Sequence, residues 1–437
     1  MKLCINYLHL ILCTALLAMP VKGQESITLA ACYEWAHTNY PLIRQYELID
    51  QTEQYNLSNA GKGWLPQLAV QAKATYQSDV TKLPFDAERF STIMPDLSIP
   101  TLNRNQYQVV AELSQTVWDG GAIHASREWV QAGAAADRKQ LESDLYALND
   151  RVNQLYFGCL LQDELLRQNA LLQRELHIML DRLRAMMDNG MANLSDCEKM
   201  EAELLNTRQR ETELKANRAA YGRMLGILIN RPLGDSVYLI VPSMPGKPLS
   251  SALSTGINRP ELQVLDMKSA LLGIQHKQVT AGLMPRVGVF VQGGYGRPGL
   301  NMLENSFEPF YVAGLRISWN MGALYTLKND RRKIEVNRRL IDVQRETFLF
   351  NTRLQAIQQH AEVRKMAELL ETDDEIVRLR TSIKKATEAK LANGVISVTD
   401  LIREINAEDQ AKQTVATHRM QQLMSVYHYM YTTNNNP

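Results

Sequence analysis

The chain has 437 residues, and its 48 Lys and Arg residues nearly balance its 47 Asp and Glu residues. This balance argues against a nucleic-acid-binding protein that works through phosphate contacts. The length allows two or three domains, or one elongated body with an internal duplication.

The amino-terminal segment predicts export. Lys2 precedes an apolar run at residues 3–19 and then a proline, as in a secretory signal peptide, which we expect to occupy residues 1–23. A competing pattern, LAAC at residues 29–32, is similar to a lipoprotein box and would place a lipid on Cys32. That pattern lies far beyond the apolar run and inside a helix-like segment, so simple cleavage is the preferred interpretation.

Cysteine content and hydropathy limit the membrane options. Cleavage would leave Cys32, Cys159 and Cys197, and three scattered cysteines give no disulfide framework. No later stretch is long and apolar enough for a transmembrane helix. A membrane location would therefore require strands in a closed barrel.

The first half, residues 24–234, predicts a helix, a strand pair and two further helices. Residues 67–77 alternate apolar and polar side chains, which is typical of a strand with one apolar face. From residue 141 onward the apolar residues step by three and four, which indicates helices that supercoil on a neighbour. The expected elements are a helix at 27–62, strands at 64–77 and 105–118, a long helix at 119–188 and a helix at 195–230.

The second half, residues 257–431, repeats this order after a proline-containing linker at 235–256. A polar tail occupies residues 432–437. The chain is thus an internal duplication, which is the first feature to seek in a long sequence. The expected elements of this half are a helix, strands at 284–296 and 308–319, a long helix at 322–392 and a helix at 399–431.

A short turn joins the last two helices of each half, and the two turns match. Asn189-Gly190 corresponds to Asn393-Gly394, because glycine ends a helix in the left-handed conformation at little cost. Asn193 corresponds to Ser397, and either Ser397 or Thr399 could cap the following helix. Asp196 corresponds to Asp400, and both would lie at the positive end of a helix.

Four strands cannot close a barrel, but three copies would supply twelve. The alternative is a soluble four-stranded sheet with one buried face. The signal peptide, the length of the helices and the aromatic residues at the strand ends favour the membrane interpretation. These aromatic residues are Tyr76, Tyr107, Trp118, Tyr295, Tyr311 and Trp319.

The duplicated order of motifs resembles the TolC family of outer-membrane efflux proteins over nearly the whole mature chain. The first-half motifs that carry the resemblance are Asn39-Tyr40-Pro41, residues 63–66 (GWLP), residues 118–121 (WDGG) and residues 190–196. Their second-half counterparts are Pro260, residues 282–285, residues 319–322 and residues 394–400. The resemblance implies a mostly α-helical fold with a four-strand membrane β part. Three chains would form a twelve-strand barrel in the outer membrane of a Gram-negative bacterium, continued through the periplasm by a helical barrel of coiled-coil hairpins.

The implied function is that of the outer-membrane channel of a tripartite efflux or type I secretion system. Its partners would be two further copies, outer-membrane lipid, a periplasmic adaptor protein and an inner-membrane pump. The adaptor would contact the tip turns, whose candidate residues are Asn189, Gly190, Asn193, Ser195, Asp196, Asn393, Gly394, Ser397 and Thr399.

Two residues after the second turn are gate candidates. In this family, gate carboxylates lie one helical turn apart just after that turn. Asp400 matches the first carboxylate, whereas Arg403 occupies the second position and could pair with Asp400. The alternative for Asp400 is helix capping alone.

No set of residues predicts catalysis, a metal site or a cofactor. Residues 293–299 are glycine-rich, but they lack the Gly-Lys-Ser/Thr of a phosphate loop and no helix begins after them. The remaining alternative is a periplasmic or surface-attached coiled-coil scaffold without a pore. Such a scaffold would have no need of four amphipathic strands.

Overall fold

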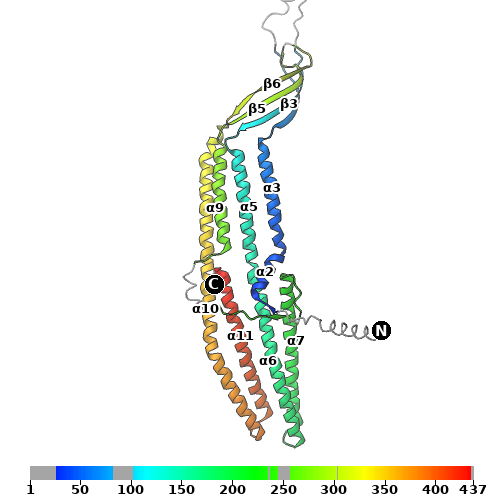
Figure 1. Cartoon of the computed structure of the whole chain (residues 1–437), viewed down its shortest axis with the longest axis vertical. Helices are drawn as coiled ribbons and strands as arrows, with labels where there is room; N and C mark the ends of the chain where they lie inside the picture. The colour runs from blue at the N-terminus through cyan, green and yellow to red at the C-terminus, as the bar shows by residue number, and fades with distance from the viewer. Residues whose placement is uncertain (1–25, 82–101, 235–236, 245–255, 303, 435–437) are drawn as a thin grey trace, which may run out of the picture. The chain divides into compact units, whose positions relative to one another are not determined.

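The computed structural model describes residues 26–81, 102–234, 237–244, 256–302 and 304–434 (Figure 1). The chain forms two compact units, and each unit draws on both halves of the sequence. Unit 1 comprises residues 1–45, 141–262 and 346–437, and unit 2 comprises residues 46–140 and 263–345. The expected signal peptide and part of the expected linker lie outside the described residues.

Unit 1 is mostly helical, as expected. It contains β1 (Ser26–Ile27), α2 (Leu29–Asn39), the 3-10 helix η1 (Pro41–Arg44), α6 (Leu148–Asp188), α7 (Leu194–Leu228), β4 (Tyr238–Leu239) and α11 (Val398–Thr433). It also includes parts of α5 (Ala122–Tyr146), α9 (Pro260–Ala281) and α10 (Ala323–Ala392). The break between α2 and η1 follows from Pro41, because the residue before a proline avoids the helical region, and Tyr40 is extended (φ −65°, ψ 134°).

Apolar residues at helical spacing form two cores in unit 1. One core joins α2, α6, α7, β4 and α11, and it encloses the side chains of Cys32, Val152, Tyr156 and Cys159. Burial raises the pKa of the Cys32 thiol to about 12. The other core lies where the helical hairpins end.

The long helix expected at 119–188 is interrupted once. α5 ends at Tyr146, and α6 begins at Leu148. Ala147 keeps helical backbone angles (φ −61°, ψ −19°), so the backbone continues in a helical path and only this one residue falls outside the two helices. The ring of Tyr146 stacks on Tyr431 with centroids 4.9 Å apart, and its hydroxyl donates to the Tyr431 carbonyl over 2.6 Å. Neither Gly nor Pro is present to signal this interruption in the sequence.

The expected linker at 235–256 is not wholly irregular. Its residues Tyr238 and Leu239 form β4, which pairs in parallel with β1. The hydroxyl of Tyr156 lies 2.8 Å from the carbonyl oxygen of Ile27 and 2.7 Å from that of Ile240, so it holds both strands to α6. Two-residue strands are too short to show alternation, and the sequence therefore gave no sign of them.

Unit 2 contains a four-stranded antiparallel sheet in the order β2-β3-β5-β6. Its elements are most of α3 (Gln45–Gly61), the 3-10 helix η2 (Lys62–Trp64), β2 (Gln67–Tyr76), β3 (Asn105–Trp118), β5 (Arg286–Arg297), β6 (Glu308–Ser318) and the adjoining parts of α5, α9 and α10. The central pairing joins the two sequence halves, since Val109 of β3 lies opposite Tyr295 of β5. Both predicted strand pairs therefore belong to one sheet.

Candidate functional site

Two features of the chain depend on its duplication: the paired hairpin turns in unit 1 and the two faces of the sheet in unit 2. The two turns have the same backbone structure. Gly190 and Gly394 adopt φ of 76° and 71°, a conformation that favours glycine. The next residue then donates backward across the turn, from Met191 to Met186 over 2.8 Å and from Val395 to Lys390 over 2.9 Å.

The residues after each turn form capping boxes. Asn193 caps α7 together with Asp196, and Ser397 caps α11 together with Asp400. Of the two caps considered for α11, the structure uses Ser397, and Thr399 lies exposed in the first turn of the helix. The predicted turn residues thus form two matched helix–turn–helix ends.

A buried cluster joins these two ends, and we call it the tip cluster. Its members come from α6, α7, α10 and α11: Leu172, Leu176, Met179, Leu180, Leu183, Cys197, Met200, Leu204, Leu391, Val398, Leu401 and Ile405. Because Leu391 and Val398 flank the second turn, that turn is fixed to the first hairpin by burial of apolar side chains.

Asp400 and Arg403 contact each other, with 3.5 Å between Oδ1 and Nη1. The Asp400 carboxylate also accepts from the Ser397 hydroxyl over 2.7 Å. These hydrogen bonds from Ser397, and then the Arg403 charge, lower the pKa of Asp400 below its usual value. Asp400 is therefore an anion that already serves as a cap, and a gate role would be additional.

Behind the tip cluster lies a buried polar network that the sequence analysis did not predict. Lys384 of α10 bonds to Glu175 of α6 and, over 2.6 Å, to Glu408 of α11. Glu408 also accepts from Thr381 over 2.6 Å and from Lys412 over 3.0 Å. We call these five residues the lysine–glutamate network, and it joins three helices of the two hairpins.

A second buried carboxylate lies beside this network. Asp409 lies 3.5 Å from the guanidinium of Arg210 on α7 and accepts from Gln413. Burial raises the pKa of Asp409, although the charge of Arg210 lowers it in part. The fold thus raises the pKa of Asp409, whereas it lowers the pKa of the adjacent Glu408.

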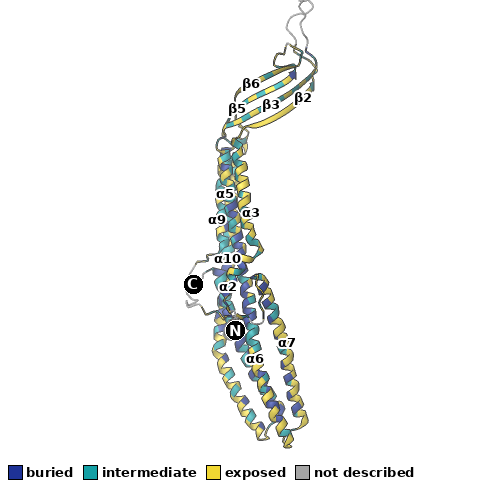
Figure 2. Cartoon of the chain, turned by 45° about the vertical axis from the view of Figure 1, so that its right-hand side comes forward, coloured by how far each residue is buried: buried dark blue, intermediate teal, exposed yellow. Residues whose placement is uncertain are grey.

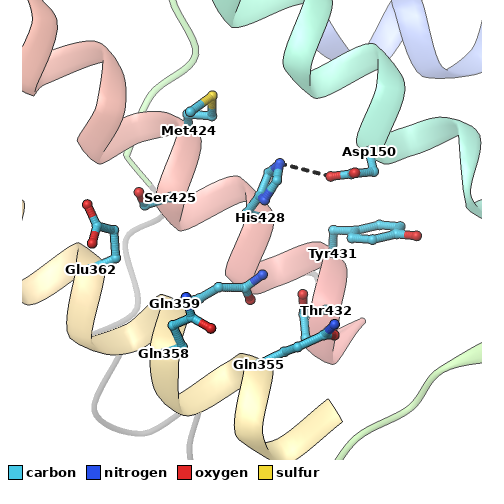
Figure 3. Close-up of a pocket in the computed structure, with 10 residues that line it drawn as sticks. All are labelled: Asp150, Gln355, Gln358, Gln359, Glu362, Met424, Ser425, His428, Tyr431 and Thr432. Carbon is cyan, nitrogen blue, oxygen red and sulfur yellow. Dashed lines mark ion pairs between the residues drawn. The ribbon is translucent and has the colours of Figure 1, made fainter. Parts of the chain in front are cut away.

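A polar cavity of about 490 Å³ lies further along α11 (Figure 3). Gln355, Gln358 and Gln359 of α10 line one side, and His428 of α11 faces Asp150 of α6 over 2.9 Å. Amide and hydroxyl side chains suit water better than an apolar molecule. Within the described residues, no group of three or more His, Cys, Asp or Glu is arranged to hold a metal ion.

The two faces of the sheet differ sharply. One face, which we call the apolar face, is exposed although it is almost entirely hydrophobic: Tyr311 is 79%, Leu315 75% and Val70 66% exposed (Figure 2). In the described part of the chain, no α-helix makes an extensive contact with the sheet. Its members are Leu68, Val70, Ala72, Ala74, Tyr76, Tyr107, Val109, Ala111, Leu113, Val289, Val291, Tyr295, Tyr311, Ala313, Leu315 and Ile317.

The opposite face, which we call the polar face, carries most of the charged residues of the strands: Lys73, Glu112, Arg286, Glu308 and Arg316. Arg297, the last residue of β5, lies opposite Tyr107 at the end of the apolar face. An exposed hydrophobic face backed by a charged one is the reverse of what a water-soluble sheet requires. Among the helices in the described ranges, none is long and apolar enough to cross a membrane.

Comparison with known proteins bears on these features. Residues 33–224 match the model of a family described as outer membrane efflux protein. The match covers less than half of the chain, and it shows that this segment is similar to members of that family. The resemblance inferred from the duplicated motifs is confirmed by this match.

Solved structures extend the likeness to the rest of the chain. The outer-membrane channel OprN superposes with a TM-score of 0.67 at 13% identity, covering 93% of this chain and 90% of that one. VceC from Vibrio cholerae gives 0.63 at 12% identity, with 93% and 96% covered. The open-state MtrE channel from Neisseria gonorrhoeae gives 0.63 at 14% identity, with 93% and 88% covered. At these identities the likeness establishes a shared fold, and no curated protein matches.

Proposed function

We propose that the protein is the outer-membrane channel of a tripartite efflux or type I secretion system in a Gram-negative bacterium. Three copies form a twelve-strand barrel in the outer membrane, and their helices form a tunnel through the periplasm. Substrate passes through by passive conduction. The tip turns contact a periplasmic adaptor protein, which is itself bound to an inner-membrane pump.

The apolar face of the sheet is the observation that carries this proposal. Sixteen outward side chains without a polar group, tyrosine hydroxyls aside, are stable only against lipid or another apolar surface. Its tyrosines, including Tyr76, Tyr107 and Tyr295, lie near strand ends, where aromatic girdles of membrane barrels lie. The polar face would then line the lumen.

The edges of the sheet support the trimer. β2 and β6 are the outer strands, so each has one edge unpaired within the described residues. Lipid does not tolerate open edges, and pairing of β6 with β2 of the next copy would satisfy both. Closure after three copies gives twelve strands, which leaves room for a lumen.

Exposed apolar residues on α10 support the same assembly. In unit 1, Phe350, Leu354 and Ile357 are exposed at spacings of four and three. In unit 2, Val336, Leu340 and Val343 repeat that spacing. Such a stripe is typical of a coiled-coil seam whose partner helix belongs to another chain.

Planar-bilayer conductance of the detergent-purified protein tests this function. We expect discrete single-channel steps from a species that sediments as a trimer. A folded protein that stays monomeric, never inserts and gives no steps would contradict the proposal and favour the scaffold alternative.

Asp400→Ala tests the gate, for which we propose Asp400 and Arg403. The variant removes the anion that holds Arg403, so we expect a looser tip and about a two-fold or greater rise in open-channel time. Loss of the helix cap alone would lower the stability of α11.

Asp196→Ala is the matched control, because Asp196 completes the same capping box in the other hairpin. Equal conductance changes in the two variants would remove Asp400 from the gate and leave it as a cap.

A further inference from the structure

Three residues on the polar face form a stacked arrangement that we call the stacking cluster: Glu112 of β3, Phe290 of β5 and Arg316 of β6. The guanidinium carbon of Arg316 lies 4.4 Å from the centroid of the Phe290 ring. Its two terminal nitrogens donate to the Glu112 carboxylate over 2.6 and 3.1 Å. The ion pair therefore crosses over the intervening strand, and Phe290 lies beneath it.

Glycines hold the aromatic rings of this face against the sheet. Phe290 lies opposite Gly314, and a Cβ at Gly314 would come 3.3 Å from the Phe290 ring. Phe310 lies opposite Gly294, where a Cβ would come within 2.3 Å of its ring. Because the missing side chains leave space for the rings, each phenyl group covers a glycine of the neighbouring strand instead of extending away from the sheet.

The chemistry of the cluster suits stacking more than charge recognition. The Glu112 carboxylate neutralises the guanidinium charge and occupies two of its donors in a bidentate pair. Phe290 covers one side of the guanidinium plane, while 52% of the Arg316 side chain remains exposed. A guanidinium is weakly hydrated and stacks on aromatic rings, so its uncovered side is available to a planar ring at a low desolvation cost.

We propose that the stacking cluster is a binding site for small planar aromatic groups of molecules passing through the channel. This inference rests on the proposed function, because the polar face lines a lumen only in the barrel. Each protomer supplies one site, and Phe310 adds a second ring surface on the same face. Binding is weak, with a dissociation constant in the millimolar range, since a conduit must release what it binds.

Caffeine is the probe, because it is planar, aromatic and uncharged. Glucose, of similar mass and without a ring system that stacks, controls for bulk effects on current. We expect millimolar caffeine, but not glucose, to lower the single-channel current of the trimer. Because the probe is uncharged, its effect on the current reports stacking and not attraction to the charges of the lumen.

Arg316→Lys and Phe290→Leu test the residues. Arg316→Lys keeps the charge and loses the plane, and Phe290→Leu keeps an apolar side chain and loses the ring. We expect each variant to weaken the caffeine effect about five-fold. Tyr325→Leu, which removes a 90% exposed aromatic side chain from α10, is the control and should leave the effect unchanged.

Two readouts separate this inference from the proposed function. The native protein and the Arg316→Lys and Phe290→Leu variants could all give channel steps with equal block by caffeine. That result would overturn the stacking site and leave the proposed channel function standing. If the tip stays closed and no steps occur, saturation-transfer NMR of caffeine on the detergent-solubilised protein decides the matter. Transfer that falls in both variants supports the site, and equal transfer overturns it.

Discussion

Val70→Arg is expected to abolish assembly of the protein into the outer membrane. Val70 lies within β2 on the apolar face and is opposite Ala111 of β3. An arginine at the bilayer midplane costs about 2–4 kcal/mol per residue, and a trimer would carry three. The measurement is the amount of trimer recovered from outer-membrane fractions, with Val109→Arg as an independent variant on the neighbouring strand.

The control for this variant is Gln71→Arg, which places the same charge on the adjacent residue of the same strand. Because successive side chains point to opposite faces, Gln71 belongs to the polar face and opposes Val110. We expect Gln71→Arg to assemble normally. If Val70→Arg assembled as well as Gln71→Arg, the apolar face would not meet lipid. The main support for the barrel would then be lost.

The contrast between these neighbours shows what the sequence could reveal about the sheet. The alternation in residues 67–77, which only Ala69 interrupts, was enough to predict a strand and to assign its two faces. The local pattern could not show that Glu112 reaches Arg316, because these residues are 204 positions apart and meet only after β5 is placed between them. Contacts across a third strand depend on the sheet order.

The hairpin ends were predictable because their structure is local. Asn-Gly followed by a cap and an acidic residue specifies a helix stop and a helix start within about ten residues. The interruption at Ala147 was not predictable, since it coincides with stacking of Tyr146 on a residue far along the chain. The gate role of Asp400 is still a prediction, because its contacts within one protomer are the helix cap with Ser397 and a local ion pair with Arg403.

The lysine–glutamate network left a signal in the sequence that was overlooked. On α11 the buried series Val398, Leu401 and Ile405 steps by three and four, and its next position is Glu408. On α10, Lys384 lies one heptad before the buried Leu391. A charge at a core position of a heptad indicates a buried partner on a neighbouring helix. Opposite charges at two such positions would have predicted this pair.

Glu408→Gln is therefore expected to destabilise the helical hairpins strongly. The Glu408 side chain is 3% exposed and that of Lys384 10%, so the substitution leaves a buried cation with Glu175 as its remaining anionic partner. Breaking a buried pair costs about 3–5 kcal/mol, and we expect about 3 kcal/mol here because Glu175 is retained. The measurement is the thermal unfolding midpoint of the detergent-solubilised protein, followed by circular dichroism.

Asp409→Asn is the matched control, since it neutralises the adjacent carboxylate with the same loss of charge. The native fold raises the pKa of Asp409, so its ionised form is disfavoured by folding at neutral pH. Neutralising this group should leave the midpoint unchanged or raise it slightly. Equal losses in the unfolding midpoint of the two variants would contradict a special role of the network. They would show that any buried carboxylate in this part of α11 contributes the same stability.

The pH dependence of the two variants should differ in sign. Burial alone would raise the pKa of Glu408, but hydrogen bonds from Lys384, Thr381 and Lys412 lower it below its usual value. Its contribution to stability is therefore complete above about pH 4.3 and is lost as the pH falls through the lowered pKa. The difference between native and Glu408→Gln proteins should shrink over that acidic range. For Asp409, whose pKa is raised, the native protein should lose stability relative to Asp409→Asn as the pH rises above about 3.9.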